Sequence, residues 1–189
     1  DISEAEEMVD AANRAKKILK CGFNHRHHPG FLEAMRRFEK GEFGKPISIT
    51  CKYGICGRPG YENEWRADPL VAAGGQYAEQ GVHAIDLFRW FLGEITDVAC
   101  MTHTGYFHKQ SMEDNGMAIF KASSGAIAML HSSLTYWKNV FSFELVGDEG
   151  YFSVEGLGGS YGTEQLTIGR RDFDAPFQDK IIYYRGGDK

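Results

Sequence analysis

Seven short apolar segments follow one another along the second half of the chain, and this pattern most constrains the fold. They cover residues 96–107, 114–122, 126–135, 141–148, 150–156, 164–171 and 180–185. Their alternating apolar and polar residues, rich in β-branched and aromatic side chains, are typical of strands. Turn-like sequences such as "SSG" and "GDEG" separate them. Strands joined by such short turns must pair antiparallel, because a parallel pair needs a long crossover.

The first half of the chain mixes helical segments with strands. Apolar residues recur at helical spacing over 3–19, 31–42 and 76–92. The last of these helices is expected to end at Gly93. An eighth strand is predicted over 47–55 and a short one at "KCGFN". The pattern predicts an α+β fold, in which a large open antiparallel sheet carries helices on one face.

Composition argues against several classes of protein. The formal net charge of −5 disfavours nucleic-acid binding, which needs clustered Lys and Arg. No apolar run approaches the roughly 20 residues needed to cross a bilayer. Four cysteines match no CxxC pair and no zinc-ligand spacing, so we expect free thiols, no metal site and a cytoplasmic location. They are Cys21, Cys51, Cys56 and Cys100.

The helix over 76–92 carries an unexpected polar side. Glu79, His83 and Asp86 are spaced to share one face of a regular helix. A carboxylate one turn from an imidazole can orient it and raise its basicity, as a general base requires. A buried histidine satisfied by acids for packing reasons explains the spacing equally well, and a metal site is a third, weaker interpretation. Gly74 and Gly75 before the helix favour a tight turn or a close backbone approach.

Three other stretches could contact a ligand. Arg66 in "EWRADP" can bind a polar substrate, or can form an ordinary surface ion pair. The "GFNHRHH" stretch follows the predicted short strand, where α/β sheets place ligands, although a solvated loop is an alternative. "TYWKN" offers Tyr136 and Trp137, aromatic rings that stack on sugars but also fill sheet faces. The "GLGGSYG" segment is interpreted as a flexible hairpin loop.

Several of these motifs together resemble one family. "GGQYAEQGVHAIDLFRWFLGE" is similar to the central signature of the Gfo/Idh/MocA family of NAD(P)-dependent oxidoreductases, and "GFNHRHHPGF" resembles the stretch at its domain junction. The family's usual aspartate before the histidine is Glu79 here, and its third glycine is Gln76. The resemblance spans nearly the whole chain, and several motifs occur in the expected order.

The resemblance implies a division into two parts. Residues 1–25 would be the last helix and strand of a Rossmann dinucleotide-binding domain, and 26–189 the substrate-binding and oligomerisation domain, truncated at its C-terminus. The glycine-rich nucleotide turn and the Glu-Lys-Pro motif of the family are absent from the sequence. The chain alone is therefore expected to be inactive, with NAD or NADP bound mainly by a preceding domain.

The resemblance also implies an activity, the oxidation of a sugar or polyol hydroxyl by hydride transfer. His83 would accept the hydroxyl proton, and Glu79 would polarise His83 or bind a neighbouring hydroxyl. Substrate-binding candidates are Asn24, Trp65, Arg66, Tyr136 and Trp137, and cofactor-binding candidates are Asn24, His25 and Arg26. Homo-oligomers through the sheet face are expected. The alternatives are a non-catalytic binding or assembly module and an NAD-dependent glycosidase of the same fold.

Overall fold

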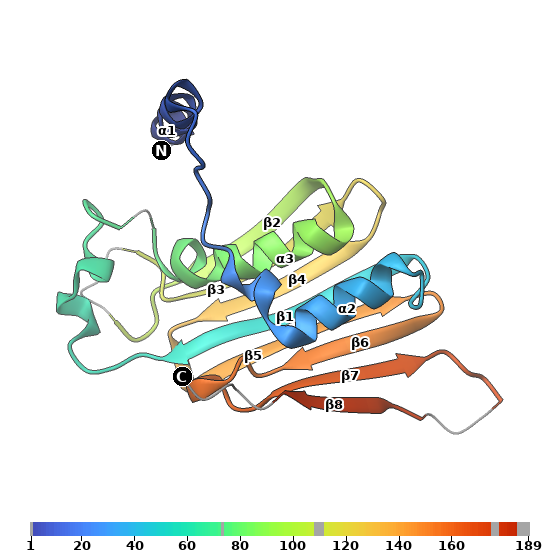
Figure 1. Cartoon of the computed structure of the whole chain (residues 1–189). Coiled ribbons are helices and arrows are strands. Elements are labelled where there is room, and N and C mark those ends of the chain that lie inside the picture. The colour runs from blue at the N-terminus through green and yellow to red at the C-terminus, as the bar shows by residue number, and fades with distance from the viewer. Residues whose placement is uncertain (1, 73, 108–111, 175–177, 185–189) are drawn as a thin grey trace.

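One sheet of eight strands forms the body of the described chain. The computed structural model describes residues 2–72, 74–107, 112–174 and 178–184. The strands are β1 (Pro46–Cys56), β2 (Ile95–His103), β3 (Asn115–Ala122), β4 (Ile127–Ser133), β5 (Thr135–Gly147), β6 (Gly150–Glu155), β7 (Glu164–Arg170) and β8 (Lys180–Tyr184). Their order is β2-β3-β4-β1-β5-β6-β7-β8 (Figure 1). The predicted α+β class and the mostly antiparallel open sheet are confirmed.

One pair of neighbours departs from the antiparallel rule. β1 pairs parallel with β4 and antiparallel with β5, so it lies between two strands that follow each other in the sequence. Only Leu134 separates β4 from β5, and the chain crosses the end of β1 there. The turn sequences predict hairpins, but they contain no information about a strand from elsewhere inserting between two neighbours.

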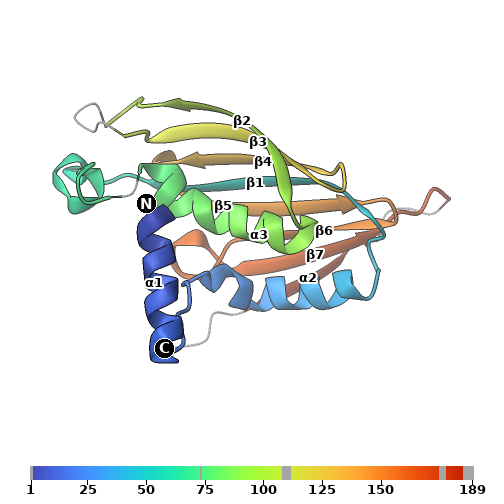
Figure 2. The same cartoon turned by 90° about the horizontal axis from the view of Figure 1, so that it is seen from above.

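Two of the described α-helices, α2 (Pro29–Glu39) and α3 (Val82–Leu92), cover one face of this sheet, and a third, α1 (Ile2–Ala15), precedes them in the chain. Figures 1 and 2 show α2 and α3 along the same face, while α1 stands apart from the sheet. None of the residues of α1 is buried. As predicted, α3 ends before Gly93, whose φ of 79° suits glycine.

The predicted strand at "KCGFN" is wrong. The first helix ends at Ala15, four residues earlier than predicted, and residues 17–23 form no regular element. A strand needs a neighbour for its backbone hydrogen bonds, and none of the described strands pairs with this segment. A 3₁₀ turn, η1 (Asn24–His27), follows instead and leads into α2.

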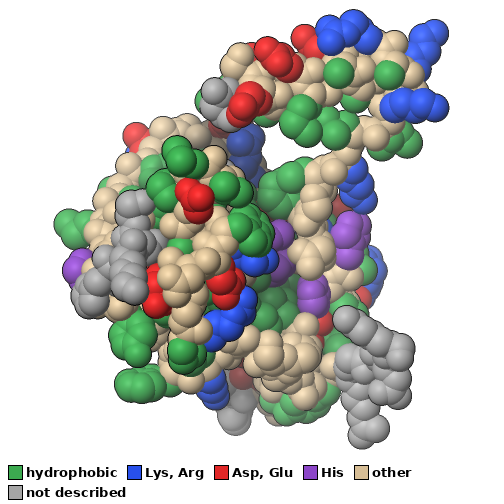
Figure 3. Space-filling view, turned by 90° about the vertical axis from the view of Figure 1, so that its left-hand side faces the viewer, with side chains coloured by type: hydrophobic (Ala, Val, Ile, Leu, Met, Phe, Trp, Pro, Cys, Tyr) green, Lys and Arg blue, Asp and Glu red, His purple; other side chains and the backbone are tan. Residues whose placement is uncertain are grey.

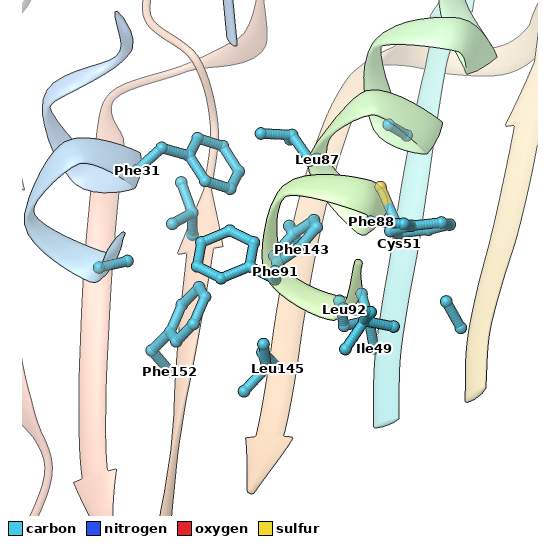
Figure 4. Packing of buried hydrophobic residues seen from close by; sticks show 14 of the residues in the cluster. Phe31, Ile49, Cys51, Leu87, Phe88, Phe91, Leu92, Phe143, Leu145 and Phe152 are labelled. Atoms are coloured by element: carbon cyan, nitrogen blue, oxygen red, sulfur yellow. The ribbon is translucent and has the colours of Figure 1, made fainter. Parts of the chain in front are cut away.

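Aromatic side chains form the centre of the core between the helices and the sheet (Figure 4). Phe91 of α3 packs 5.7 Å from Phe143 of β5 and 5.2 Å from Phe152 of β6, measured between ring centroids. Phe31 of α2 reaches the same cluster, 5.1 Å from Phe143. Burying each such side chain contributes about 2–3 kcal/mol. The cluster fixes α3, and therefore the polar residues at its start, against the sheet.

The other face of the sheet is apolar over β2, β3 and β4. Side chains that are about half exposed or more on this open face are Met101, Met117, Ile119, Ile127 and Met129. All of them except Ile127 line a shallow hollow of about 610 Å³. Contiguous exposed apolar patches commonly mark surfaces at which a protein binds a partner.

Candidate active site

The turn that precedes α3 is not an α-helical turn. Residues Tyr77–Gly81 form a π-helical turn, in which the Val82 amide bonds the Tyr77 carbonyl, five residues earlier. Such a turn holds one residue more than an α-helical turn. Glu79 lies within it, whereas His83 is the second residue of α3, so the two predicted catalytic residues lie on different helical segments. Single π-turns of this kind are frequent at functional sites.

A backbone contact explains the glycines before this turn. The Glu113 carboxylate accepts hydrogen bonds from the backbone amides of Gly75 and Tyr77, and the Glu113 carbonyl accepts one from the amide of Gln76. A β-carbon at Gly75 would lie 2.1 Å from the Glu113 carbonyl oxygen, so only glycine fits. Of the two interpretations of Gly75, close backbone approach holds, and the neighbour is the segment before β3.

His83 opens α3 as a half-buried imidazole. Its Nδ1 atom is enclosed and has no hydrogen-bond partner. Burial lowers the pKa of His83, and the negative charge of Asp86 raises it in part. The ring is therefore neutral near pH 7, which is the form that accepts a proton. Histidine side chains gather beside a hollow under the segment that leads from α1 (Figure 3).

Glu79 bonds other partners than His83. Its carboxylate accepts a hydrogen bond of 2.8 Å from the Tyr61 hydroxyl and one of 2.5 Å from Nε of Arg66. Within the described part of the chain, no hydrogen bond joins it to His83. The expectation that Glu79 polarises His83 directly therefore finds no contact in the structure. Glu64 lies 3.9 Å from the Arg66 guanidinium and adds a second negative charge.

Asp86 is the carboxylate on the helical turn of His83, and it is held by Arg26. Nε and Nη2 of Arg26 donate hydrogen bonds of 2.6 and 2.7 Å to the two carboxylate oxygens. The guanidinium also lies over the ring of Trp90, 5.3 Å from its centroid. This two-point pair ties η1 to α3. Arg26, predicted to bind cofactor, uses these donors within the protein.

Asn24 and His25, the other two residues predicted to bind cofactor, differ in solvent exposure. Asn24 is exposed, whereas His25 is only 4% exposed and lies against His83. Asn24 is thus free to contact a ligand through its amide, although its Oδ1 atom lies 3.1 Å from Nδ1 of His25. Because His25 is buried, it does not line the cleft as a cofactor-binding residue would.

Trp65 and Arg66 lie together beside Glu79. The Trp65 ring is 58% exposed, and the Arg66 guanidinium lies 4.4 Å from its centroid. A hollow of about 200 Å³ opens between these residues and the start of the π-turn. An exposed aromatic face beside a carboxylate and a guanidinium is suited to a polyhydroxylated ring.

The structure places Tyr136 on the open face of the sheet and not beside His83. The Tyr136 hydroxyl bonds Nδ1 of His131 at 2.8 Å, and its ring covers Gly54 on the open face. Trp137 is 97% exposed at the start of β5. Tyr136 therefore lies away from the pocket in which it was expected, whereas the substrate-binding role of Trp137 stays a prediction. The "TYWKN" sequence marks an irregular stretch at which the register between β1 and β5 shifts.

Two tyrosines near Glu79 were not predicted from the sequence as site residues. Tyr53 of β1 and Tyr161 of η5 (Gly159–Tyr161) have ring centroids 5.7 Å apart. Burial is the main cause that raises the pKa of both hydroxyls, and the Glu79 charge raises it further. The "GLGGSYG" segment, interpreted as a flexible loop, therefore carries a side chain toward this site. Its glycines at positive φ, among them Gly158 and Gly162, shape the turn.

The described residues are suited to contact the nicotinamide ring of a dinucleotide, but not to hold its phosphates. The exposed Asn24 amide and the neutral His83 imidazole are suited to the place where a hydride leaves a carbon. Among the described elements, no glycine-rich turn joins a strand to a helix to hold the phosphates. The same part of the chain holds no group of three or more metal-binding side chains and no helix that could span a membrane.

Comparison with known proteins identifies a consistent set of relatives. Residues 31–153 match the sequence profile of the GFO/IDH/MocA C-terminal domain. The chain is 30% identical over 152 residues to the 1,5-anhydro-D-fructose reductase of Ensifer adhaerens, covering 79% of this chain and 45% of the relative. It is 29% identical over 159 residues to the scyllo-inositol 2-dehydrogenase (NAD(+)) of Bacillus subtilis, covering 77% and 43%. It thus spans a little under half the length of these curated relatives.

Solved structures share the fold. A levoglucosan dehydrogenase in complex with NADH superposes with a TM-score of 0.83 at 21% identity, covering 96% of this chain and 51% of the other. The aldose-aldose oxidoreductase of Caulobacter crescentus gives a TM-score of 0.78 at 19% identity, covering 100% and 53%.

Proposed function

The chain belongs to the GFO/IDH/MocA family, and we propose that it is the substrate-binding part of an NAD(P)-dependent dehydrogenase. The enzyme oxidises a hydroxyl-bearing carbon of a sugar or polyol. Residues 26–189 form the substrate domain, and residues 1–25 lead from a dinucleotide-binding domain. The exposed α1, which stands apart from the sheet, supports this division. The names of the curated relatives, a sugar reductase and an inositol dehydrogenase, support the substrate class.

His83 is the proposed base. A neutral imidazole at the start of a helix, with Nδ1 enclosed, accepts a proton from a substrate hydroxyl through its other nitrogen, Nε2. As the O–H bond breaks, its electrons form the carbonyl, and the hydride leaves the same carbon. The nicotinamide, when bound, supplies the acceptor for that hydride. The half-buried position of the His83 ring, with Nδ1 enclosed at the start of α3, is the observation that carries this assignment. The lowered pKa agrees with it, because a protonated ring could not act as base.

Glu79, Arg66 and Trp65 are proposed to bind the remaining hydroxyls. The Glu79 carboxylate uses two of its acceptor sites internally and retains others for substrate O–H groups. The exposed ring of Trp65 offers an apolar face to a sugar ring. Asn24, which is exposed and precedes the His25 ring that stacks on His83, is proposed to contact substrate or nicotinamide.

A substrate panel tests the proposal. The protein with its dinucleotide-binding domain is mixed with NAD+ or NADP+ and with inositols, aldoses and anhydrosugars, and reduced nicotinamide is followed by absorbance. Formation of NADH or NADPH with at least one polyol is expected. If no panel member is oxidised and no nucleotide binds, a binding module is the better assignment. Cleavage of a glycoside without net NADH formation would indicate the glycosidase alternative.

The open face of the sheet is proposed to join copies of the chain. Met117 and Ile119 of β3 are 59% and 54% exposed on an apolar surface continuous with that of β2 and β4. Burying such a surface against a second copy removes apolar area from water. Ile119→Lys is expected to reduce the mass measured by light scattering, whereas Leu32→Lys on α2, a residue of similar exposure, leaves it unchanged. Equal masses for both variants would contradict this surface.

The four free thiols and the enzyme class support a cytoplasmic location as a proposal.

A further inference from the structure

His83 lacks the hydrogen bond that usually orients a catalytic imidazole. A base histidine generally has its second nitrogen bonded to a carboxylate or a carbonyl, which fixes tautomer and direction. Here Nδ1 is enclosed without a partner, Asp86 is engaged by Arg26, and Glu79 is engaged by Tyr61 and Arg66. The orientation of the His83 ring must therefore come from packing.

His25 provides that packing. Its ring lies 4.6 Å from the ring of His83, and the two planes are only 26° apart, a stacked arrangement. Phe23 packs edge-on from another side, at 6.1 Å and 88°. Both residues belong to the "GFNHRHH" stretch, so one short segment contacts the candidate base on two sides.

His25 is itself fixed on several sides. Its ring lies 5.1 Å from Tyr53, 5.6 Å from Phe141 and 5.7 Å from His28. His28 in turn bonds the buried carboxylate of Glu164 at 3.0 Å, which anchors η1 to β7. A ring surrounded in this way cannot move without a cavity forming around it. It is a rigid wall for His83.

Resting on the proposed function, we propose that His25 is a positioning residue, whose buried ring holds His83 in its reactive orientation and leaves His83 to take up the substrate proton alone. Burial is the main cause that lowers the pKa of His25, to about 3, and His83 and His28 contribute further. A second positive charge within the stack is therefore unfavourable, and His25 stays neutral throughout. The proton that leaves the hydroxyl is held on Nε2 of His83 until it passes to solvent.

The charged and titratable groups around the His25 and His83 rings are paired with one another. The pairs are Asp86 with Arg26 on the α3 side, His28 with Glu164 on the α2 side, Tyr53 with Tyr161 on the sheet side, and Glu79 with Arg66 on the loop side. In the stacked rings themselves, by contrast, two buried nitrogens have no hydrogen-bond partner: Nε2 of His25 and Nδ1 of His83.

Two substitutions of His25 test whether His83 depends on the stacked ring or on the nitrogens that the ring carries. His25→Phe keeps a flat ring against His83, and His25→Ala removes it. In the protein with its dinucleotide-binding domain, His25→Ala is expected to lower kcat by about ten- to a hundredfold with little change in KM, because the base loses its alignment. His25→Phe is expected to retain kcat within about threefold. His27→Ala, at the exposed neighbouring histidine, is the matched control and leaves kcat unchanged.

A second readout does not depend on activity. In NMR titrations of the histidine rings, the pKa of His83 stays lowered in His25→Phe and rises toward its ordinary value in His25→Ala, where water reaches the ring. An unaltered His83 titration and unaltered kcat in His25→Ala would overturn the positioning role. If the pKa of His83 rises to its ordinary value in both variants, the nitrogens of His25 and not its stacked ring are responsible, which would also overturn the positioning role. If the wild-type protein oxidises no polyol, the proposed function fails, while the titration still decides whether His25 holds His83.

Discussion

The Glu79 carboxylate lies 2.5 Å from Nε of Arg66, and within the described part of the chain no hydrogen bond joins it to His83, the imidazole it was expected to orient. This pairing separates the site into two units. One is the hydroxyl-binding group formed by Glu79, Arg66 and Tyr61, and the other is the imidazole of His83 with its stacked neighbour.

Glu79→Gln is expected to leave the pKa of His83 unchanged, whereas Asp86→Asn is expected to lower it. The Asp86 charge favours protonated His83, and its removal also leaves the Arg26 cation unpaired nearby. Histidine NMR titration of the two variants measures both values. A fall in the His83 pKa in Glu79→Gln as large as in Asp86→Asn would restore Glu79 as the orienting carboxylate.

Arg26→Met is expected to reduce the free energy of unfolding by about 2 kcal/mol, because it leaves a largely buried Asp86 carboxylate without its two donors. Chemical denaturation measures the change. Arg36→Met is the control: its pair with Glu33 on α2 is an exposed i,i+3 contact, expected to contribute less than about 0.5 kcal/mol. Equal losses would mean that the Arg26 pair contributes no more than a surface contact.

Gly75→Ala is expected to destabilise the protein by about 2 kcal/mol or more and to disturb the start of the π-turn, since a β-carbon would overlap the Glu113 backbone. Gly22→Ala is the comparison, because nothing lies within 4 Å of a β-carbon there. It should be neutral or slightly stabilising. Thermal unfolding followed by circular dichroism gives both values, and a Gly75→Ala protein as stable as Gly22→Ala contradicts the close approach.

The loss of unfolding free energy at acidic pH should depend in part on His25. Its pKa is lowered to about 3 by burial, so between about pH 6.5 and pH 3 the unfolded chain binds a proton that the folded chain does not. The contribution of this residue to stability is therefore present above pH 6.5 and is lost as the pH falls. His25→Phe should show a shallower loss of unfolding free energy over this range in urea titrations. Identical pH profiles would show that His25 is not buried as described.

Much of the fold could be predicted from the sequence, because alternation and turn residues are local signals. All eight main strands are found, and Gly93 ends α3 as expected. Two features could not be found in this way. The insertion of β1 between β4 and β5 depends on contacts far apart in the sequence. The short "KCGFN" segment looks like a strand, but no described neighbour pairs with it.

The site was predicted less completely for the same reason. His83 and Glu79 lie near one another in the sequence, but their partners come from elsewhere in the chain: Tyr61 and Arg66 bond Glu79, and the His25 ring stacks on His83. Tyr136 looked like a ligand-binding aromatic, yet one strand position decides which face it occupies, and it lies on the open face. Tyr161 lay in a glycine-rich stretch whose three-dimensional position local patterns do not encode.

The most direct test of the central claim is the turnover of His83→Asn in the protein with its dinucleotide-binding domain. The loss of the base is expected to reduce kcat for polyol oxidation by about 10²- to 10⁴-fold while nucleotide affinity stays the same. His103→Asn, at an exposed histidine on β2, should oxidise at the wild-type rate. Turnover of His83→Asn close to that of the wild type would contradict the assignment of His83 as the group that accepts the hydroxyl proton.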